Sequence, residues 1–78
     1  MEDLLVLLAK GLVEDKDSVK VTVDEEPDES GRTVYHLTVA EGDMGRVIGK
    51  QGRIAKAIRT IMSAAAAREN KKVAVEIG

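Results

Sequence analysis

Two glycines three positions apart, with a lysine and a glutamine between them, form the most informative pattern of this 78-residue chain: Gly49-Lys50-Gln51-Gly52. Glycine adopts backbone angles that other residues avoid, and because it has no Cβ atom another chain can approach its backbone closely. The free N–H groups that open a following helix attract anions. Lys50 adds a positive charge and Gln51 adds hydrogen-bonding groups. The tetrapeptide is therefore suited to contact a sugar-phosphate backbone.

Other glycine-rich motifs do not fit this region. A Walker P-loop has four residues between its glycines and then Lys-Ser or Lys-Thr, whereas three residues separate Gly45 from Gly49 and the next two are Lys50 and Gln51. A dinucleotide fingerprint needs G-x-G-x-x-G directly after a strand of a parallel βαβ unit, and neither the spacing nor the expected topology is present. The segment 42–45 also has a glycine at each end, but Asp43 would repel phosphate, so we interpret Asp43 as a helix cap.

The glycines lie between two predicted helices. Asp43 is expected to cap a short helix over 44–48, and a longer helix is expected from Gly52 to about Arg68. In the longer helix, apolar residues at helical spacing predict a buried stripe: Ile54, Ile58, Ile61, Met62 and Ala65. Polar residues project the other way: Arg53, Lys56, Arg59 and Ser63. One face of this helix should pack while the opposite face is basic.

The rest of the chain predicts one more helix and three strands. Apolar residues at helical spacing indicate a helix over about 2–14. Alternating apolar residues indicate strands at 19–23 and 34–39, joined as an antiparallel hairpin by an acidic turn at 26–31, and a third strand at 73–77. The order αββααβ predicts an α+β fold, with a three-stranded sheet covered on one face by three helices. Residues 1–78 should form a single domain, because a chain this short holds one core.

Charge is divided unevenly along the chain. Residues 1–43 carry four basic and twelve acidic side chains, a net charge of −8, whereas residues 44–78 carry eight basic and two acidic ones, a net charge of +6. The location of the charged residues relative to a motif must decide whether this charge asymmetry serves to bind a polyanion or is only a solvated surface. The glycine pattern lies in the basic half.

Composition argues against several other classes. The chain has no cysteine, which excludes disulfides and thiolate metal sites and makes the cytoplasm the expected compartment. Its longest apolar run, 4–9, is too short to span a membrane. His36 is the single histidine, and the acidic residues cluster in loops and termini without a catalytic pair, so we expect no enzymatic activity, cofactor or metal.

Residues 47–54, Val-Ile-Gly-Lys-Gln-Gly-Arg-Ile, resemble the signature of KH domains, whose GxxG loop clamps about four single-stranded nucleotides. The element order resembles the type II, prokaryotic variant, and the match over 43–60 and 64–70 resembles the KhpA family of small bacterial RNA-binding proteins. The resemblance implies that bases lie over a groove edged by Val47, Ile48, Ile54, Ile58 and the adjacent strand. It implies these RNA-binding residues: Arg46, Val47, Ile48, Gly49, Lys50, Gln51, Gly52, Arg53, Ile54 and Lys56.

The same resemblance implies partners and a role. It implies single-stranded RNA as ligand, a homodimer, and pairing with the larger KH protein KhpB, also called Jag. The implied role is post-transcriptional regulation or RNA chaperoning linked to cell elongation and division. With no Phe or Trp and only Tyr35, the chain has little means to stack bases, so we expect weak, salt-sensitive binding with modest sequence preference. The residues alone do not distinguish RNA from single-stranded DNA.

An alternative is a protein-interaction module in which RNA binding is secondary. Leu7 points away from the inner stripe of the first helix, and small residues on the outer side of the long helix allow close approach: Ala57, Ala64 and Ala67. Such a surface suits a second copy of the chain or a related KH protein.

Overall fold

The computed structural model describes residues 1–77 apart from the side chains of Ile48, Lys50 and Gln51, so the predictions for those three side chains lie outside the described residues. The elements follow in the order α1 (Glu2–Leu12), η1 (Lys16–Ser18), β1 (Lys20–Val23), β2 (Thr33–Thr38), α2 (Glu41–Arg68) and β3 (Val73–Ile77). The predicted α+β class is confirmed. None of the helices among these residues is long and apolar enough to cross a membrane.

The sheet is mixed, with strand order β1-β2-β3. β1 pairs antiparallel with β2, and Val21 lies opposite Leu37, as the hairpin prediction required. β3 pairs parallel with β2, and Tyr35 lies opposite Val75. The parallel pairing follows from the crossover, because α2 carries the chain from the end of β2 back to the level where β2 begins. Because β3 stands last in the strand order, it is an edge strand.

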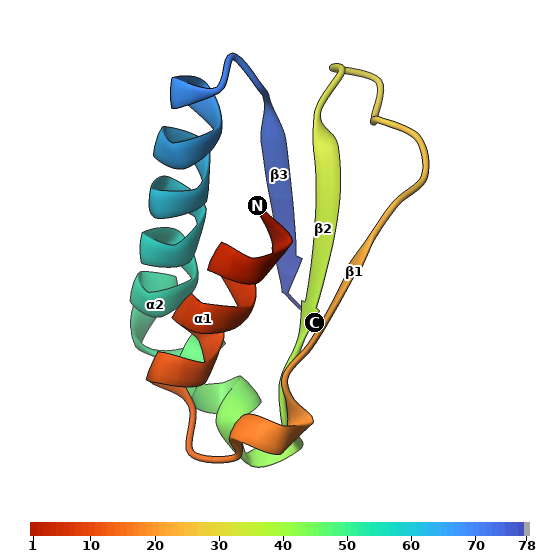
Figure 1. Ribbon diagram of the computed structural model, residues 1–78. Helices are drawn as coiled ribbons and strands as arrows, with labels where there is room; N and C mark the ends of the chain where they lie inside the picture. Colours follow the sequence, from red (N-terminus) through yellow and green to blue (C-terminus); the bar gives the residue numbers. More distant parts are fainter. Residues whose placement is uncertain (78) are drawn as a thin grey trace.

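Helices α1 and α2 cover one face of this sheet and lie beside each other (Figure 1). The core forms where the inner sides of the two helices meet the alternate residues of the strands: Leu5, Ala9, Val13, Tyr35, Leu37, Val39, Val47, Ile58, Met62 and Val75. Tyr35, the one aromatic residue, is 8% exposed and belongs to this core. It is consequently not available at the surface to stack on a base.

The buried stripe of α2 differs from the prediction. Ile61 is 44% exposed and Ala65 is half-buried, whereas Ala55 and Ala66 are buried together with the predicted Ile58 and Met62. Positions 55, 58, 62 and 66 follow one another at three- and four-residue steps, so they share a face of the helix. The stripe is therefore rotated toward small residues, and Ile61 is left on the surface.

Helix α2 is assigned as one element where the sequence predicted two. The predicted break persists as backbone geometry, because Gly52 lies inside α2 with a φ of 69°. Figure 1 shows α2 changing direction between its green first turns and its teal continuation. The glycine segment thus lies at a bend between two helical stretches.

The prediction that Asp43 caps a helix is wrong. Helix α2 begins at Glu41, with Ala40 as its N-cap and without a capping side-chain hydrogen bond, so Asp43 already lies in the first turn. Its carboxylate instead accepts hydrogen bonds from the backbone N–H groups of Glu14 at 3.1 Å and Asp15 at 3.0 Å. Asp43 therefore fastens the segment after α1 to the start of α2.

Candidate nucleic-acid interface

The two glycines of the pattern are half-buried and differ in backbone conformation. Gly52 adopts a φ of 69°, a left-handed conformation in which a side chain is strained. Gly49 does not need that conformation, and a Cβ atom added there would meet nothing within 4 Å among the described residues. Gly52 therefore allows the bend, and open space adjoins both glycines.

Cationic side chains flank these glycines. Arg53 and Lys56 are exposed on the next turn of α2, and Ile54 between them is half-buried against the core. Arg46, on the preceding turns, donates from Nη2 to Oε1 of Glu14 at 2.9 Å. Such an exposed ion pair contributes little free energy, so a phosphate can compete with Glu14 for this guanidinium. All three cations thus remain usable by an anionic ligand.

Two apolar residues predicted to edge the groove belong to the interior instead. Val47 and Ile58 are each 1% exposed and are packed in the core cluster. A domain of this size needs its large aliphatic residues to fill one core, which leaves few of them for a surface. Of the described apolar residues predicted at this site, Ile54 is the one with accessible surface.

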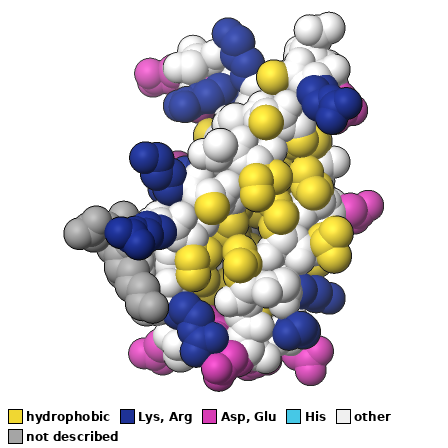
Figure 2. All heavy atoms as spheres, turned by 90° about the vertical axis from the view of Figure 1, so that its left-hand side faces the viewer, with side chains coloured by type: hydrophobic (Ala, Val, Ile, Leu, Met, Phe, Trp, Pro, Cys, Tyr) yellow, Lys and Arg dark blue, Asp and Glu magenta, His cyan; other side chains and the backbone are white. Residues whose placement is uncertain are grey.

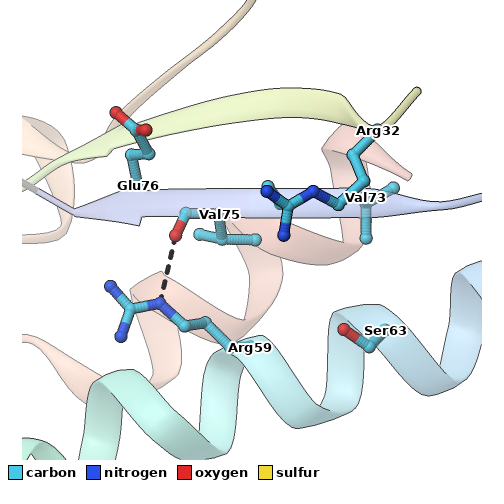
Figure 3. A pocket seen from close by; sticks show the side chains of 7 residues that line it. Arg32, Arg59, Ser63, Val73, Val75 and Glu76 are labelled. Carbon is cyan, nitrogen blue, oxygen red and sulfur yellow. Dashed lines mark hydrogen bonds between the residues drawn. The ribbon is translucent and has the colours of Figure 1, made fainter. Parts of the chain in front are cut away.

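A groove lies between α2 and the edge strand β3. It holds a hollow of about 320 Å³, lined by Arg32, Arg59, Ser63, Val73, Ala74, Val75 and Glu76. Arg59 crosses this groove, with Nε donating to the carbonyl oxygen of Val75 at 3.1 Å (Figure 3). Gly52, Lys56, Arg59 and Ser63 follow at helical spacing, so they share one side of α2, and Arg59 and Ser63 on that side line the hollow.

The β3 side of the groove offers backbone hydrogen-bonding groups. Thr33 N–H donates to the carbonyl of Lys72 at 2.9 Å, so the backbone polar groups of Lys72 face β2. Successive residues of a strand direct these groups to opposite sides. The backbone groups of Val73 and Val75 therefore face the open edge, where Arg59 already occupies the carbonyl of Val75. Edge groups of this kind can pair with the polar edge of a base.

A second hollow, of about 340 Å³, continues the groove toward the turn between α2 and β3. It is lined by Arg32, Ser63, Ala67, Lys71, Lys72 and Val73, and it shares Arg32, Ser63 and Val73 with the first hollow. The RNA-binding residues expected from the sequence did not include Arg59, Lys71 or Lys72. Helical spacing from Gly52 is the signal that identifies Arg59. Arg32 has no sequence signal, because its position depends on the parallel register of β2 and β3.

Two carboxylates stabilise the segments that carry these cations. Asp28 accepts from the backbone N–H and Nε of Arg32, both at 2.9 Å. The backbone N–H of Arg32 is the main cause that lowers the pKa of Asp28. The backbone N–H groups of Asp15 and Glu14 likewise lower the pKa of Asp43. Both carboxylates are therefore ionised at neutral pH. Asp28 fixes the loop that carries Arg32 beside the groove, and Asp43 fixes the segment after α1.

The described residues hold no group of three or more His, Cys, Asp or Glu side chains arranged to bind a metal ion. His36 lies on the face of the sheet that the helices leave open, with Nε2 3.0 Å from Oδ1 of Asp24 and Nδ1 3.7 Å from Oε2 of Glu76. These contacts join neighbouring strands across the sheet, and Glu76 also lines the first hollow. The contacts of His36 therefore indicate a structural role for this side chain.

The outer side of the two helices carries an apolar surface. Leu7 and Leu12 of α1 and Ile61 of α2 are exposed, with Leu7 the most exposed at 69%. Figure 2 shows apolar side chains gathered over the helical face, with Lys and Arg side chains along its margin. The basic groove and the apolar surface are thus adjacent but distinct.

Known proteins resemble this chain over nearly its whole length. The family model for the KH domain of KhpA/KhpB matches residues 2–77. The RNA-binding protein KhpA of Clostridium acetobutylicum is 53% identical over 77 residues, covering 99% of each chain. KhpA of Listeria monocytogenes is 49% identical, covering 99% of this chain and 97% of that protein. KhpA of Chlamydia trachomatis is 42% identical, covering 99% and 95%.

Solved structures give the same fold. An Era variant of Aquifex aeolicus bound to GDP·AlF4⁻ aligns with a TM-score of 0.68 at 20% identity, covering 97% of this chain and 28% of that one. An Era complex that contains a segment of 16S ribosomal RNA aligns with a TM-score of 0.63, with the same identity and coverage. The KhpA/KhpB family is not enzymatic, in agreement with the sequence prediction. From the family match over nearly its whole length, the relatives at about 50% identity and the observed fold, the chain belongs to the KhpA/KhpB family of KH domains.

Proposed function

We propose that this chain binds single-stranded RNA, with the segment 49–52 against the sugar-phosphate backbone and the bases in the groove between α2 and β3. The observation that carries the proposal is the left-handed bend at Gly52 beside the open space at Gly49, next to a basic groove. Relatives that match this chain over its length are named as RNA-binding proteins, which supports the same ligand.

The arrangement of the groove suggests which residues would contact the phosphates and which would contact the bases. Phosphates next to Gly49 and Gly52 gain backbone N–H groups at the bend and the charges of Arg53 and Lys56. Bases then lie over Ile54 and toward the open edge of β3. Terminal amino groups of Arg59 would donate to an acceptor on a base, because only its Nε is engaged by Val75.

Weak affinity follows from the same residues. Stacking on an aromatic side chain contributes about 1–3 kcal/mol per base, and the one aromatic residue, Tyr35, is buried. Most of the free energy must then come from phosphate contacts, which weaken as salt rises. A single domain should bind with modest sequence preference, and association of two domains would raise affinity through avidity.

Fluorescence anisotropy with a pool of short single-stranded RNAs across a salt series tests this function. The variant Lys50→Asp/Gln51→Asp should lose binding, because it brings two carboxylates to the phosphates. The control Lys20→Glu/Thr22→Glu makes the same change in net charge on exposed positions of β1 and should bind nearly as wild type. Circular dichroism verifies that all variants fold. Absence of binding by wild type, or equal loss in both variants, would overturn the proposed clamp.

A second function, self-association, is favoured by the exposed apolar surface. We propose that Leu7, Leu12 and Ile61 contact a second copy of the chain or the KH domain of KhpB. Light scattering at tens of micromolar should give the mass of a dimer. Leu7→Glu/Ile61→Glu should be monomeric, whereas Thr22→Glu, on the open face of the sheet, should remain dimeric. A monomeric wild type would reject homodimerisation through this surface.

The cellular role that we propose is post-transcriptional regulation or RNA chaperoning in the cytoplasm, together with KhpB and linked to cell elongation and division. The support is that one family model describes the KH domains of both KhpA and KhpB. Co-purification of tagged chain with KhpB and RNA tests the partnership. Recovery of neither would remove its basis.

A further inference from the structure

The far end of the groove has an electrostatic character of its own. The second hollow, of about 340 Å³, is lined by three cationic residues, Arg32, Lys71 and Lys72, and by no carboxylate. We call these three residues the basic end. The hollow shares lining residues with the groove, so a strand that follows the groove away from the glycine segment reaches the basic end next.

A tight turn brings the two lysines to this position. Helix α2 ends at Arg68, and Asn70 adopts a φ of 58°, a left-handed conformation that asparagine tolerates better than most residues. The backbone N–H of Lys71 then donates to the carbonyl of Ala66 at 2.9 Å. This closure carries Lys71 and Lys72 directly to the start of β3. Neither lysine takes part in an ion pair among the described residues.

Arg32 reaches the same position from a distant part of the sequence. Thr33 N–H donates to the carbonyl of Lys72 at 2.9 Å, which brings the preceding residue, Arg32, next to the lysines. Asp28 binds Nε of Arg32 at 2.9 Å and leaves its terminal amino groups for another acceptor. Asp28 offsets part of the local charge, but the two lysines keep the basic end strongly positive.

We propose that the basic end binds a phosphate of the same RNA strand, beyond the nucleotides held at the glycine segment, so that the footprint exceeds the four nucleotides of the loop. This inference rests on the proposed RNA binding. The fifteen-residue advance along α2 from Gly52 to Ala67 corresponds to about 22 Å. A strand stacked at about 3.4 Å per nucleotide covers that distance in six to seven nucleotides.

A length series with single-stranded oligouridine tests the basic end. Wild type and Lys71→Ala/Lys72→Ala are titrated with strands of four and ten nucleotides, the shorter strand by ¹⁵N chemical-shift titration. The variant should bind the ten-nucleotide strand about tenfold more weakly at low salt, and the slope of log K against log salt should fall by about 0.7, the value for one lost phosphate contact on a single strand. Affinity for the four-nucleotide strand should not change.

Lys10→Ala/Lys20→Ala is the matched control, because it removes the same charge from exposed positions of α1 and β1. It should bind both strands nearly as wild type. If Lys71→Ala/Lys72→Ala binds the longer strand as the control does, while Lys50→Asp/Gln51→Asp abolishes binding, the basic end is refuted and the proposed function stands. Equal weakening for both lengths would also refute a separate contact. If wild type binds neither strand, both proposals are wrong.

Discussion

Arg59 joins the two walls of the groove, because its Nε donates to the carbonyl oxygen of Val75 at 3.1 Å while its Cα belongs to α2 (Figure 3). The bond fixes the plane of the guanidinium at the open edge of the sheet. The edge carbonyl that Arg59 occupies is no longer free to pair with another strand. Its terminal amino groups stay directed at the groove, where a charge-assisted hydrogen bond to a base or phosphate is stronger than a neutral one.

Replacing Arg59 by alanine should therefore lower RNA affinity about tenfold, through loss of a charge-assisted hydrogen bond of about 1.5–3 kcal/mol that is partly offset by solvent. Arg59→Lys keeps the charge but not the planar fork, so its affinity should lie between those of wild type and Arg59→Ala. Anisotropy titrations of the three proteins measure this order. An Arg59→Ala protein that binds as tightly as wild type would show that ligand does not enter this groove.

Gly49 and Gly45 form a matched pair for testing whether the RNA backbone closely approaches the protein backbone at Gly49. Both lie in α2, and a Cβ atom at either meets nothing within 4 Å among the described residues. Alanine is the better helix former by about 1 kcal/mol, so neither Gly49→Ala nor Gly45→Ala should lower the melting temperature. Only Gly49→Ala should weaken RNA binding, severalfold, because its methyl group occupies the space of a phosphate. Equal affinities of the two variants would contradict a backbone contact at Gly49.

Asp43 should make stability depend on pH in the acidic range. Two backbone N–H groups lower its pKa, so the unfolded chain binds its proton more readily than the folded chain. The stabilisation is complete above the unfolded pKa of about 3.9 and is lost as pH falls through the folded value. Urea unfolding between pH 6 and 3 should show that the free energy of unfolding falls more steeply for wild type than for Asp43→Asn, in which position 43 cannot titrate. The pH dependence that Asp28 contributes is the same in both proteins. Free energies of unfolding that fall in parallel with pH would therefore refute this role of Asp43.

Local patterns predicted the elements well. Alternation of apolar residues located the three strands, and the turn-forming residues between β1 and β2 correctly indicated an antiparallel hairpin. The Gly49–Gly52 pattern predicted backbone angles that other residues avoid, and Gly52 adopts such a conformation with a φ of 69°. Each of these features depends on residues close together in sequence, where backbone preference and side-chain spacing act directly.

Features that depend on tertiary packing were not predictable in the same way. Hydrophobicity favoured Ile61 as a core residue, but the rotation of α2 on the sheet buries Ala66 and exposes Ile61. Asp43 was interpreted as a cap because the start of α2 could not be located to within two residues, and its actual donors lie 28 and 29 positions away. Arg32 reaches the groove only through the pairing of β2 with β3.

Mapping RNA onto the backbone amides by ¹⁵N chemical-shift perturbation tests the central claim most directly. A short single-stranded RNA is titrated into uniformly labelled protein at low salt. We expect the largest shifts at Gly49–Gly52 and at Val73 and Val75 on the edge strand, and we expect them to diminish as salt is added. Shifts confined to α1 around Leu7, or none in the groove at saturating RNA, would contradict RNA binding at this site.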